Sequence, residues 1–586
     1  MKHTKSYIPG HPNPQFTRKE FLSLDGEWNF CFDDENKGII NKYFDNFPTT
    51  HKINVPYTYE TEASGIHDEK VHNVVWYNKK LNYKLNEKEV ILHFEGVDYH
   101  ARVYVNGHFA GEHFGGYSRF SINIKEFLVD GENDITVRVY DDLSCTRSRG
   151  KQRWMHHSYE CFYVQTTGIW KSVWLEEVSS TYLLSTFMTP SFKNNNVEIE
   201  YKIAGDFTDC EIETIITFGD ELISKERKTL TRDIFSQTFD VTTDSATMKT
   251  HRWTHYCPNL YDVEFNIYRN GKLIDKVLSY FGVVEFSANG NSIYVNRDQL
   301  YLRLILDQGY YKETGLTLNE EQIIKDITLM KDIGLNGARK HEKIECDLFY
   351  YYCDILGYYL WQEMPSCYEW RKDSIKNLSQ EWINVLYQHH NHPCIMTNVI
   401  INESWGTMTI RDHQDQQQFV NGLYYLTKSI ENNRFVISND GWEHTISDLL
   451  TLHNYSGTYD ELMEEYTLSE DDLSSRHRYI HTGPKAFDCE GYNNSNKPII
   501  LSEFAGIAFA KDKDLGWGYG DLVKDEEQFL KRFKEQIDAI FDSKIFSGFC
   551  ITQLSDVEQE VNGLVDVDRN YKVSKEELRK IISRRY

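Results

Sequence analysis

The second half of the chain alternates short apolar runs with helical patterns, and each apolar run ends in a polar residue. Apolar runs of this length between helical segments are typical of strands buried on both faces of a parallel sheet. Eight such runs follow one another, which indicates a (β/α)8 TIM barrel over residues 286–586. The eight polar ends are Asp307, Arg339, Glu363, Glu403, Asn439, Tyr455, Glu503 and Gln553.

Two of these ends are single glutamates after strongly apolar runs. Glu403 follows the run that begins at Ile395, and Glu503 follows the run that begins at Pro498. Burying a carboxylate is costly unless it is hydrogen-bonded or has a chemical task. In barrel enzymes the chemistry lies at the carboxyl ends of the strands. We therefore predict that Glu403 and Glu503 form a catalytic pair across the barrel mouth.

The first half of the chain has a different texture, with short alternating strands separated by Gly, Asn and Asp. The dipeptide Asn106-Gly107 between two such strands is a β-hairpin signal. We predict a β-sandwich domain over residues 1–178. A second stretch of similar texture, residues 179–285, has the length of an immunoglobulin-like β-sandwich. The whole chain is therefore predicted to be multidomain.

Charge and cysteine usage exclude several classes of partner. The formal net charge is −25 and no long basic run exists, so nucleic acid is not an expected partner. The short basic cluster at 147–153 is interpreted as a solvated loop. Neither a signal peptide nor a membrane-spanning run is apparent. Eleven cysteines without CxxC pairs fit reduced thiols. We predict a cytoplasmic protein without a membrane partner.

Two patterns that could suggest a metal are interpreted otherwise. Residues 566–577 match several positions of a calcium-binding EF-hand loop, but Tyr571 stands where the loop needs glycine. The run His389-His390-Asn391-His392 is assigned a structural role. We therefore expect neither a metal nor a cofactor.

Six or more fragments, in order along the chain, make the sequence resemble glycoside hydrolase family two, the β-galactosidase, β-glucuronidase and β-mannosidase family. The resemblance covers nearly the whole length, and it implies that residues 1–178 form a jelly-roll, sugar-binding-like domain. The fragments are Phe94–Asp98, Val103–Gly107, Gly115–Phe120, Thr167–Glu176, Leu329–Arg339, Cys353–Gly357, Asn391–Ile395 and Asn402-Glu403.

The resemblance implies that Glu403 is the general acid/base, that Glu503 is the nucleophile and that Asn402 contacts the sugar 2-hydroxyl. We expect Glu403 to be protonated at the start of the reaction, because a dry pocket and the nearby charge of Glu503 would favour its neutral form. Arg339 is a candidate partner that keeps Glu503 ionised, and Tyr455 can donate a hydrogen bond to it. The further predicted substrate contacts are Asp307, His341, Glu363, His453 and Trp517.

The sequence determines the identity of the sugar less firmly than it determines the family. β-Glucuronidases of the family have an Asn-x-Lys pair after the eighth strand, whereas residues 556–563 here are acidic, which disfavours a glucuronide. The Trp that β-galactosidases have after that strand is also missing, since the chain reads Thr552-Gln553 there. The frequency of activities in the family favours a retaining exo-β-glycosidase acting on a β-D-galactoside. Arabinosidase, mannosidase, galactofuranosidase and uronidase activities stay as alternatives.

Two further points stay open at this stage. A carbohydrate-binding protein with an inactive barrel is the alternative from another class, although neither carboxylate is missing. We expect the amino-terminal domain to close one side of the barrel mouth and leave a pocket for a small glycoside or oligosaccharide. A homo-oligomer is compatible with the sequence.

Overall fold

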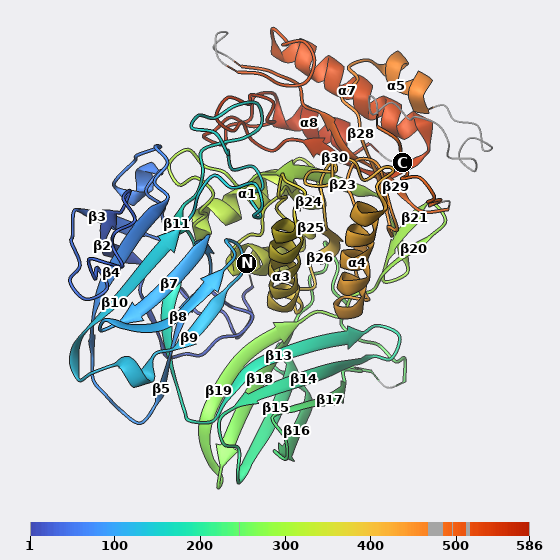
Figure 1. Cartoon of the computed structure of the whole chain (residues 1–586). Coiled ribbons are helices and arrows are strands. Elements are labelled where there is room, and N and C mark those ends of the chain that lie inside the picture. Colours follow the sequence, from blue (N-terminus) through green and yellow to red (C-terminus); the bar gives the residue numbers. More distant parts are fainter. Residues whose placement is uncertain (1, 245, 467–484, 495, 511–515, 585–586) are drawn as a thin grey trace.

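The structure is a computed structural model of the whole chain. It describes residues 2–244, 246–466, 485–494, 496–510 and 516–584. Figure 1 shows three parts: a β-sandwich at the left, a second β-sandwich at the bottom, and an α/β part at the upper right. These are the predicted jelly-roll, immunoglobulin-like and barrel folds, so the fold class is confirmed.

The first sandwich packs a six-stranded sheet, in the order β3-β2-β4-β10-β7-β8, against a four-stranded sheet, in the order β1-β12-β5-β9. Alternate residues of each strand point into a core that contains Trp28, Tyr77 and Phe94. The predicted hairpin is confirmed, because Asn106 and Gly107 both have positive φ between β7 and β8. The strands are β1 (Phe21–Ser23), β2 (Gly26–Phe32), β3 (His51–Val55), β4 (Val74–Tyr83), β5 (Glu89–Phe94), β6 (Val97–Asp98), β7 (His100–Val105), β8 (His108–Phe114), β9 (Phe120–Asn123), β10 (Gly131–Tyr140), β11 (Gly168–Ile169) and β12 (Val173–Val178). Two short 3-10 helices are η1 (Glu62–Ser64) and η2 (Lys125–Phe127).

The second sandwich packs a three-stranded sheet, β13-β14-β17, against a four-stranded sheet, β16-β15-β18-β19. In β14 every second residue is buried, namely Val197, Ile199, Tyr201 and Ile203, as the period of two in a strand requires. The strands are β13 (Tyr182–Ser191), β14 (Asn196–Ala204), β15 (Cys210–Phe218), β16 (Glu221–Thr229), β17 (Ile234–Asp240), β18 (Tyr261–Arg269) and β19 (Lys272–Phe281).

The third part is an eight-stranded parallel sheet that curls into a nearly closed barrel, in the order β27-β26-β25-β24-β23-β30-β29-β28. Its strands are buried on both faces, which explains why the sequence shows continuous apolar runs there instead of alternation. The barrel strands are β23 (Leu302–Asp307), β24 (Gly337–Lys340), β25 (Tyr359–Glu363), β26 (Ile395–Val399), β27 (Phe435–Ile437), β28 (Leu450–His453), β29 (Ile499–Ala505) and β30 (Phe546–Thr552). A small sheet of β20 (Phe286–Asn289), β21 (Ser292–Val295) and β22 (Asp298–Leu300) precedes the barrel.

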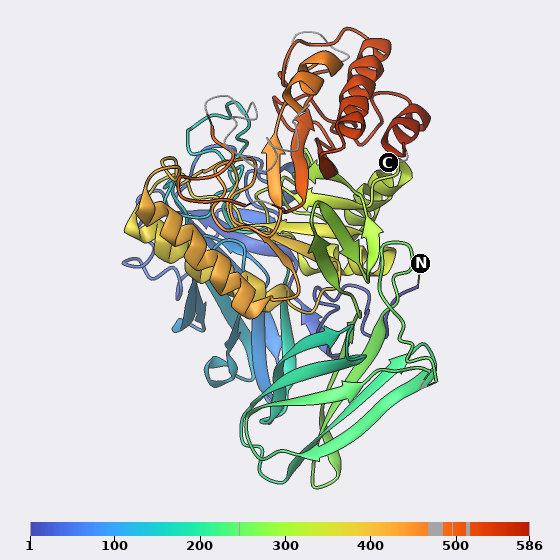
Figure 2. The ribbon, with the colours of Figure 1, turned by 90° about the vertical axis from the view of Figure 1, so that its right-hand side faces the viewer.

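Helices pack around the barrel, and Figure 2 shows α3 and α4 side by side on one of its flanks. The start of helix α1 is fixed by Asn319 and Gln322, which form a reciprocal capping box. The described helices are α1 (Glu320–Asp332), α2 (Asp347–Leu356), α3 (Lys372–His389), α4 (Gln414–Ile430), α5 (Tyr459–Tyr466), α7 (Glu526–Ser543) and α8 (Lys575–Ile582). None of the helices in the described ranges is long and apolar enough to cross a membrane.

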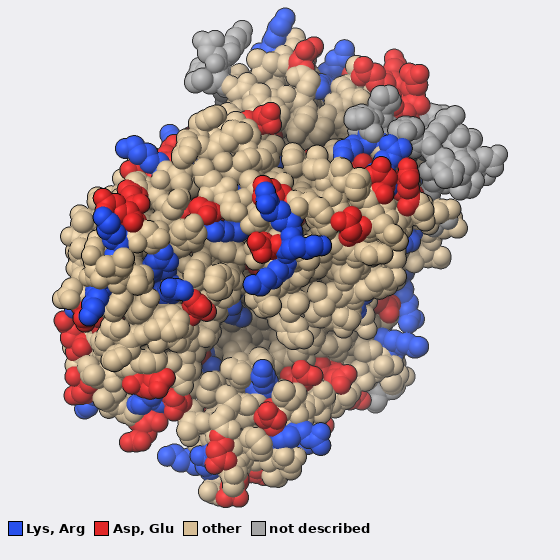
Figure 3. Space-filling view, in the orientation of Figure 1, with Lys and Arg blue, Asp and Glu red and all other residues tan. Residues whose placement is uncertain are grey.

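The three parts meet at buried polar contacts. Arg18 lies at this junction, where its guanidinium forms ion pairs with Glu176 of β12 at 2.7 Å and Asp275 of β19 at 2.9 Å. Figure 3 shows that the surface is hollowed where the two sandwiches meet the barrel, and side chains such as His113, Lys202 and Tyr387 line a groove there. The barrel mouth lies elsewhere, at the carboxyl ends of the parallel strands.

Candidate active site

Glu403 and Glu503 reach the same place from different strands. Glu503 lies within β29, next to a register irregularity between Leu501 and Phe504. Glu403 follows β26 and has φ of 51°, and its backbone N–H donates to the Asp440 carbonyl at 2.9 Å. A carboxylate oxygen of each glutamate and a ring nitrogen of His453 lie within 4.8 Å of one another. The structure therefore brings the predicted pair together at the barrel mouth.

Glu503 is held at both of its oxygens. Arg339 donates from Nη1 to Glu503 Oε1 at 2.8 Å, and the Tyr455 hydroxyl donates to Glu503 Oε2. The Tyr455 ring is in turn stacked on Tyr519, with centroids 3.4 Å apart and planes 4° apart. These contacts restrict the carboxylate of Glu503, which is 4% exposed, to one orientation.

Arg339 links four polar groups at the centre of the site and is itself fully buried. It pairs with Glu363 and, through Nη1, lies 2.7 Å from Asp440 Oδ2. Its Nη2 donates to Asn402 Oδ1 at 2.8 Å. A planar guanidinium suits this role because its donors have fixed directions.

Asn402 keeps one amide group free. Its Oδ1 is used by Arg339, whereas its Nδ2 has no hydrogen-bond partner among the residues that the structure describes. Asn402 is 1% exposed and directly precedes Glu403 in the sequence. A buried unpaired donor is unfavourable in a folded protein, so this amide is a ready donor for a ligand.

The protonation state of Glu403 differs from our expectation. Burial opposes ionisation of Glu403, but the hydrogen bond and charge of His453, with the charge of Lys151, outweigh it and lower the pKa of Glu403. Nδ1 of His453 lies 2.7 Å from Glu403 Oε1, and its Nε2 lies 2.9 Å from Asp440 Oδ2. Burial disfavours charge on His453, yet the surrounding carboxylates raise its pKa to about 10. The shared proton of this pair is therefore held on His453 and not on Glu403.

The remaining predicted residues lie at different distances from this pair. Glu363 belongs to the site because it forms an ion pair with Arg339. Burial raises the pKa of Glu363 to about 6, although the charge of Arg339 opposes this shift. His341 Nδ1 lies 2.9 Å from Glu363 Oε1, and Glu363 in turn contacts Arg339. Asp307 is not part of the cluster, because its carboxylate is 1% exposed and ion-paired with Lys340 at 2.8 Å. Trp517 lies at the rim, where its indole donates to the Glu160 carbonyl. Whether each of these residues contacts a sugar stays a prediction.

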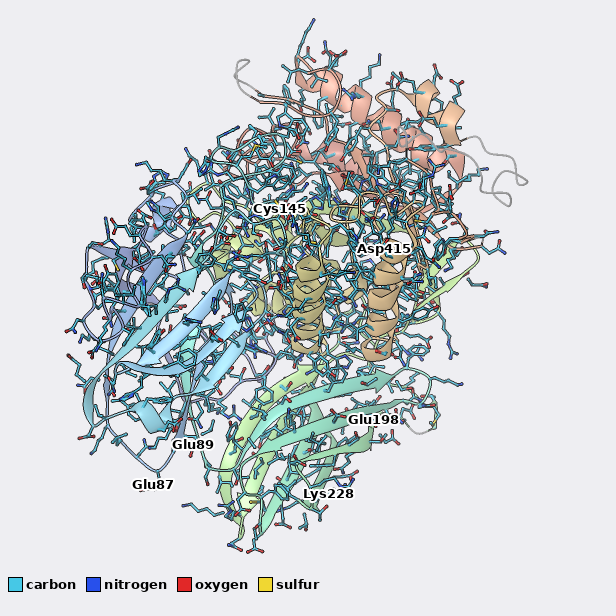
Figure 4. The ribbon with its side chains drawn as sticks, in the orientation of Figure 1. Glu87, Glu89, Cys145, Glu198, Lys228 and Asp415 are labelled. Carbon is cyan, nitrogen blue, oxygen red and sulfur yellow. The ribbon has the colours of Figure 1, made fainter. Side chains whose placement is uncertain are left out.

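The basic cluster at 147–153 is not the solvated loop that we predicted. It belongs to a long segment between β10 and β11, residues 141–167, which we call the mouth loop; Cys145 marks it in Figure 4. Arg149 and Arg153 are buried, and the Arg149 N–H donates to the Ser366 carbonyl at 2.9 Å. Lys151 of this loop has a side chain that is 9% exposed and faces the carboxylates of the site.

The mouth loop is joined to the loop after the eighth barrel strand. The Tyr163 hydroxyl donates to Glu560 Oε2, and the Val164 N–H donates to Glu558 Oε1 at 2.9 Å. Sequence reasoning missed Lys151, Tyr163 and Asp440 because none of the three carries a local signal. The length of the loop was a sign of function that could have been used, since long unstructured segments inside compact domains are commonly functional.

In the described structure, neither the EF-hand-like residues 566–577 nor the histidine run at 389–392 gathers its side chains around one point, as a metal site would require. Residues 566–577 form the loop before α8 and the first turn of that helix; Arg569 pairs with Asp326 at 2.9 Å, and Ser574 caps the helix. The three histidines of the 389–392 run contact three different carboxylates. These pairs are His389 with Asp347, His390 with Glu431 and His392 with Asp354.

Comparison with known families assigns all three parts of the chain. Residues 21–178 match the model described as "Glycosyl hydrolases family 2, sugar binding domain", and residues 181–283 match "Glycosyl hydrolases family 2". Residues 286–585 match "Glycosyl hydrolases family 2, TIM barrel domain", which covers more than half of the chain. The chain belongs to glycosyl hydrolases family 2. The resemblance seen in the sequence is thereby confirmed.

Individual family 2 proteins resemble the chain at low identity. A putative β-glucuronidase of Formosa agariphila is 26% identical over 80% of this chain and 57% of that protein. A β-galactosidase of Thermoanaerobacter pseudethanolicus is 28% identical over 65% of this chain and 50% of that protein. The chain thus spans little more than half the length of these two relatives.

Solved structures share the whole fold. A β-glucuronidase of an uncultured Clostridium sp. has a TM-score of 0.77 at 17% identity, covering 98% of this chain and 99% of that one. A family 2 β-galacturonidase from Eisenbergiella tayi has a TM-score of 0.74 at 19% identity, covering 97% of each chain. At such identities the likeness establishes the fold alone.

Proposed function

We propose that this family 2 protein is a retaining exo-β-glycosidase that removes one terminal sugar by double displacement. The observation that carries the proposal is the approach of Glu403 and Glu503 oxygens to within 4.8 Å. Retaining enzymes hold their two carboxyl groups about 5–5.5 Å apart, whereas inverting enzymes need about 6.5–9.5 Å to admit a water. The shorter separation supports attack by a carboxylate over attack by water.

Each residue of the site has a task in this reaction. Glu503, held by Arg339 and Tyr455, attacks the anomeric carbon of the sugar. Glu403 gives a proton to the glycosidic oxygen, the aglycone leaves, and a glycosyl ester forms on Glu503. Glu403 then takes a proton from water, which attacks the anomeric carbon and releases the sugar with its β configuration retained.

Asn402 and His453 assist these two carboxylates. Asn402 donates to the sugar 2-hydroxyl in this proposal, which is supported by the absence of a hydrogen-bond partner for its Nδ2 among the described residues. The acid form of Glu403 arises when the proton between His453 Nδ1 and Glu403 Oε1 moves along their 2.7 Å contact, which leaves a neutral imidazole. One shared proton thus serves as the acid of the first step.

The position of the mouth loop supports exo action, that is, removal of the terminal sugar of a glycoside. It lies on the barrel loops through Ser366, Glu558 and Glu560, so it covers one side of the barrel mouth. A pocket closed on one side accepts a terminal sugar better than an internal one. Two classes of sugar are candidates. A β-D-galactoside is favoured by the frequency of activities in the family, and a β-uronide is supported by the cation Lys151 and by the names of the full-length structural relatives.

A panel of aryl β-glycosides tests the proposal. We expect turnover of at least one of them, and proton NMR of the first product should show the β anomer. Glu503→Gln should lower kcat by more than about 10³-fold, as loss of a nucleophile does in other enzymes. Azide should restore turnover to Glu503→Ala, and the product should be a glycosyl azide of inverted configuration.

The matched control is Glu490→Gln, which changes an exposed glutamate and should leave turnover unchanged. Folded protein that turns over none of the panel would contradict the enzyme assignment and favour a carbohydrate-binding protein. Normal hydrolysis by Glu503→Gln would show that the nucleophile is another residue.

A further inference from the structure

Lys151 is fixed in the barrel mouth by its backbone. Gly150, the preceding residue, has φ of 58°, and a Cβ added there would lie 2.2 Å from the Glu342 carbonyl oxygen. Only glycine allows the mouth loop to approach the loop after β24 this closely. The Gly150 N–H donates to the Ser366 carbonyl, and the Lys151 carbonyl accepts from the Tyr163 N–H at 2.9 Å. The position of the Lys151 side chain is thus built into the fold.

The ammonium group of Lys151 lacks oxygen partners. Its Nζ has one hydrogen bond, to Cys161 Sγ at 3.5 Å, and its nearest carboxylate oxygen, Glu342 Oε2, lies 4.0 Å away. Throughout the described part of the chain no oxygen accepts a hydrogen bond from Nζ. An ammonium has three N–H donors, and a charge that is nine-tenths buried without matched acceptors is costly.

The acidic groups around Lys151 are already engaged by other residues. Glu342 accepts from the Tyr368 hydroxyl at 3.0 Å, and Glu560 accepts from Asn562 at 2.8 Å as well as from Tyr163. Burial raises the pKa of Glu342 and of Glu560, and the charge of Lys151 opposes this shift. Neither carboxylate accepts a hydrogen bond from the Lys151 ammonium.

Lys151 also lies within electrostatic reach of the catalytic pair. Burial opposes the charge of Lys151, but Cys161 and the carboxylates of Glu342, Glu403 and Glu503 together raise its pKa, so it stays protonated. Two other cations, Arg339 and the protonated His453, lie in the same site. Of these three cations Lys151 alone has no hydrogen bond to an oxygen in the described residues.

We propose that Lys151 binds an anionic group on the terminal sugar, and that the substrate is a β-uronide whose carboxylate accepts from Lys151 Nζ. This inference rests on the proposed glycosidase function. A carboxylate gives charge-assisted hydrogen bonds that are about twice as strong as those of a neutral hydroxyl. It supplies what the buried ammonium lacks, whereas a galactose hydroxyl supplies an acceptor without the charge.

The acidic run at 556–563, which disfavours a uronide when read from the sequence, is largely neutralised in the fold. Asp556 is ion-paired with Lys572 at 2.7 Å. Glu558 accepts from the Val164 N–H and the Tyr310 hydroxyl, and burial raises its pKa. The repulsion expected from this run is therefore reduced.

Kinetics on three nitrophenyl substrates test the inference: a β-D-galacturonide, a β-D-glucuronide and a β-D-galactopyranoside. We expect wild type to prefer a uronide. Lys151→Met should lower kcat/KM on that uronide by about 10- to 100-fold, the loss expected for a hydrogen bond to a charged group, and should change the galactoside rate by less than about 5-fold. Lys151→Gln keeps a donor without the charge and should behave like Lys151→Met.

Controls separate charge recognition from folding. Lys151→Arg should restore part of the uronide rate, and thermal unfolding should show that each variant is folded. Lys70→Met, at an exposed lysine of the same domain, should leave all three rates unchanged. Equal losses on uronide and galactoside, or a wild-type preference for the galactoside, would overturn the anion site while the glycosidase assignment stands.

A binding measurement covers the case of no turnover. Calorimetry with D-galacturonate, D-glucuronate and D-galactose on Glu503→Gln does not depend on catalysis. Tighter binding of a uronate that is lost in the Glu503→Gln, Lys151→Met double variant would support the site. Binding of no uronate would overturn it.

Discussion

At the scale of single residues, the site depends on buried charges that hold one another in place. Arg339 fixes Glu503, Glu363 and Asn402, while His453 lies between Glu403 and Asp440. Breaking one partner of such a buried network is costly because the others are left without compensation. Each side chain therefore contributes both to stability and to geometry.

His453 should make stability depend on pH. Its pKa is raised from 6.5 to about 10, so the protonated ring stabilises the fold fully below pH 6.5, and this contribution is lost as the pH rises towards 10. His453→Gln should lower the free energy of unfolding by about 3 kcal/mol at the acid end of this window. The difference from wild type should shrink as the pH rises.

Chemical denaturation at a series of pH values measures this difference. His108→Gln, at an exposed position of β8, is the control and should track wild type throughout. A difference that stays constant between pH 6.5 and 10 would show that His453 is not charged in the folded protein.

Glu403 should matter most for poor leaving groups. A proton on the glycosidic oxygen is needed for an alkyl aglycone but hardly for a dinitrophenolate, and general acid catalysis contributes about 10²–10⁴-fold. Glu403→Gln should therefore lower kcat/KM on a methyl glycoside about 10²-fold more than on the dinitrophenyl glycoside of the same sugar. Parallel losses on both substrates would assign the proton to another group.

At the scale of elements, the mouth loop connects the first sandwich to the barrel. It leaves β10 at Tyr140, returns at β11, and is held by backbone and side-chain donors instead of by strands. Its geometry depends on a few hydrogen bonds to the loop that follows β30. The Tyr163 hydroxyl bond to Glu560 is the most buried of them.

Tyr163→Phe should loosen the mouth loop. Removing the hydroxyl leaves Glu560 short of a donor, at a cost of about 1–3 kcal/mol for a buried acceptor. Trypsin should then cut faster after Arg147, Lys151 and Arg153, as peptide mapping by mass spectrometry would show. Tyr256→Phe, at a residue that is 71% exposed, provides the control. Unchanged cleavage in Tyr163→Phe would mean that other contacts hold the loop.

At the scale of the molecule, the two sandwiches are coupled by buried ion pairs. Arg18, ahead of the first strand, contacts β12 through Glu176 and β19 through Asp275, and its Nη2 donates to the Leu183 carbonyl. It thus joins both sandwiches by one side chain. The domain boundaries at 178 and 285 stay predictions, although this junction lies close to both.

Arg18→Met should uncouple the sandwiches. Removal of the cation leaves Glu176 and Asp275 buried without a partner, at a cost of about 3–5 kcal/mol. We expect a lower Tm and a broader or split transition in calorimetry. Arg297→Met removes an exposed cation that lies 3.8 Å from Glu285 and should change stability by less than about 1 kcal/mol. A single unshifted transition in Arg18→Met would contradict the coupling.

Local patterns in the sequence determine much of this protein. The eight apolar runs, the Asn106-Gly107 turn and the Asn319–Gln322 cap each specify their element through neighbouring residues. The carboxyl ends of parallel strands necessarily gather at one edge, so the approach of Glu403 to Glu503 could also be predicted. These features need only short-range rules and one topological rule.

Only the tertiary structure decided which charged side chains share the site and which protonation state each of them has. Lys151 comes from a different domain than Glu342, and no spacing in the sequence relates them. The lowered pKa of Glu403 follows from His453, which reaches it from a strand 50 positions away in the chain. Long-range electrostatics depends on distances through space and on burial, and both are fixed only when the domains pack together.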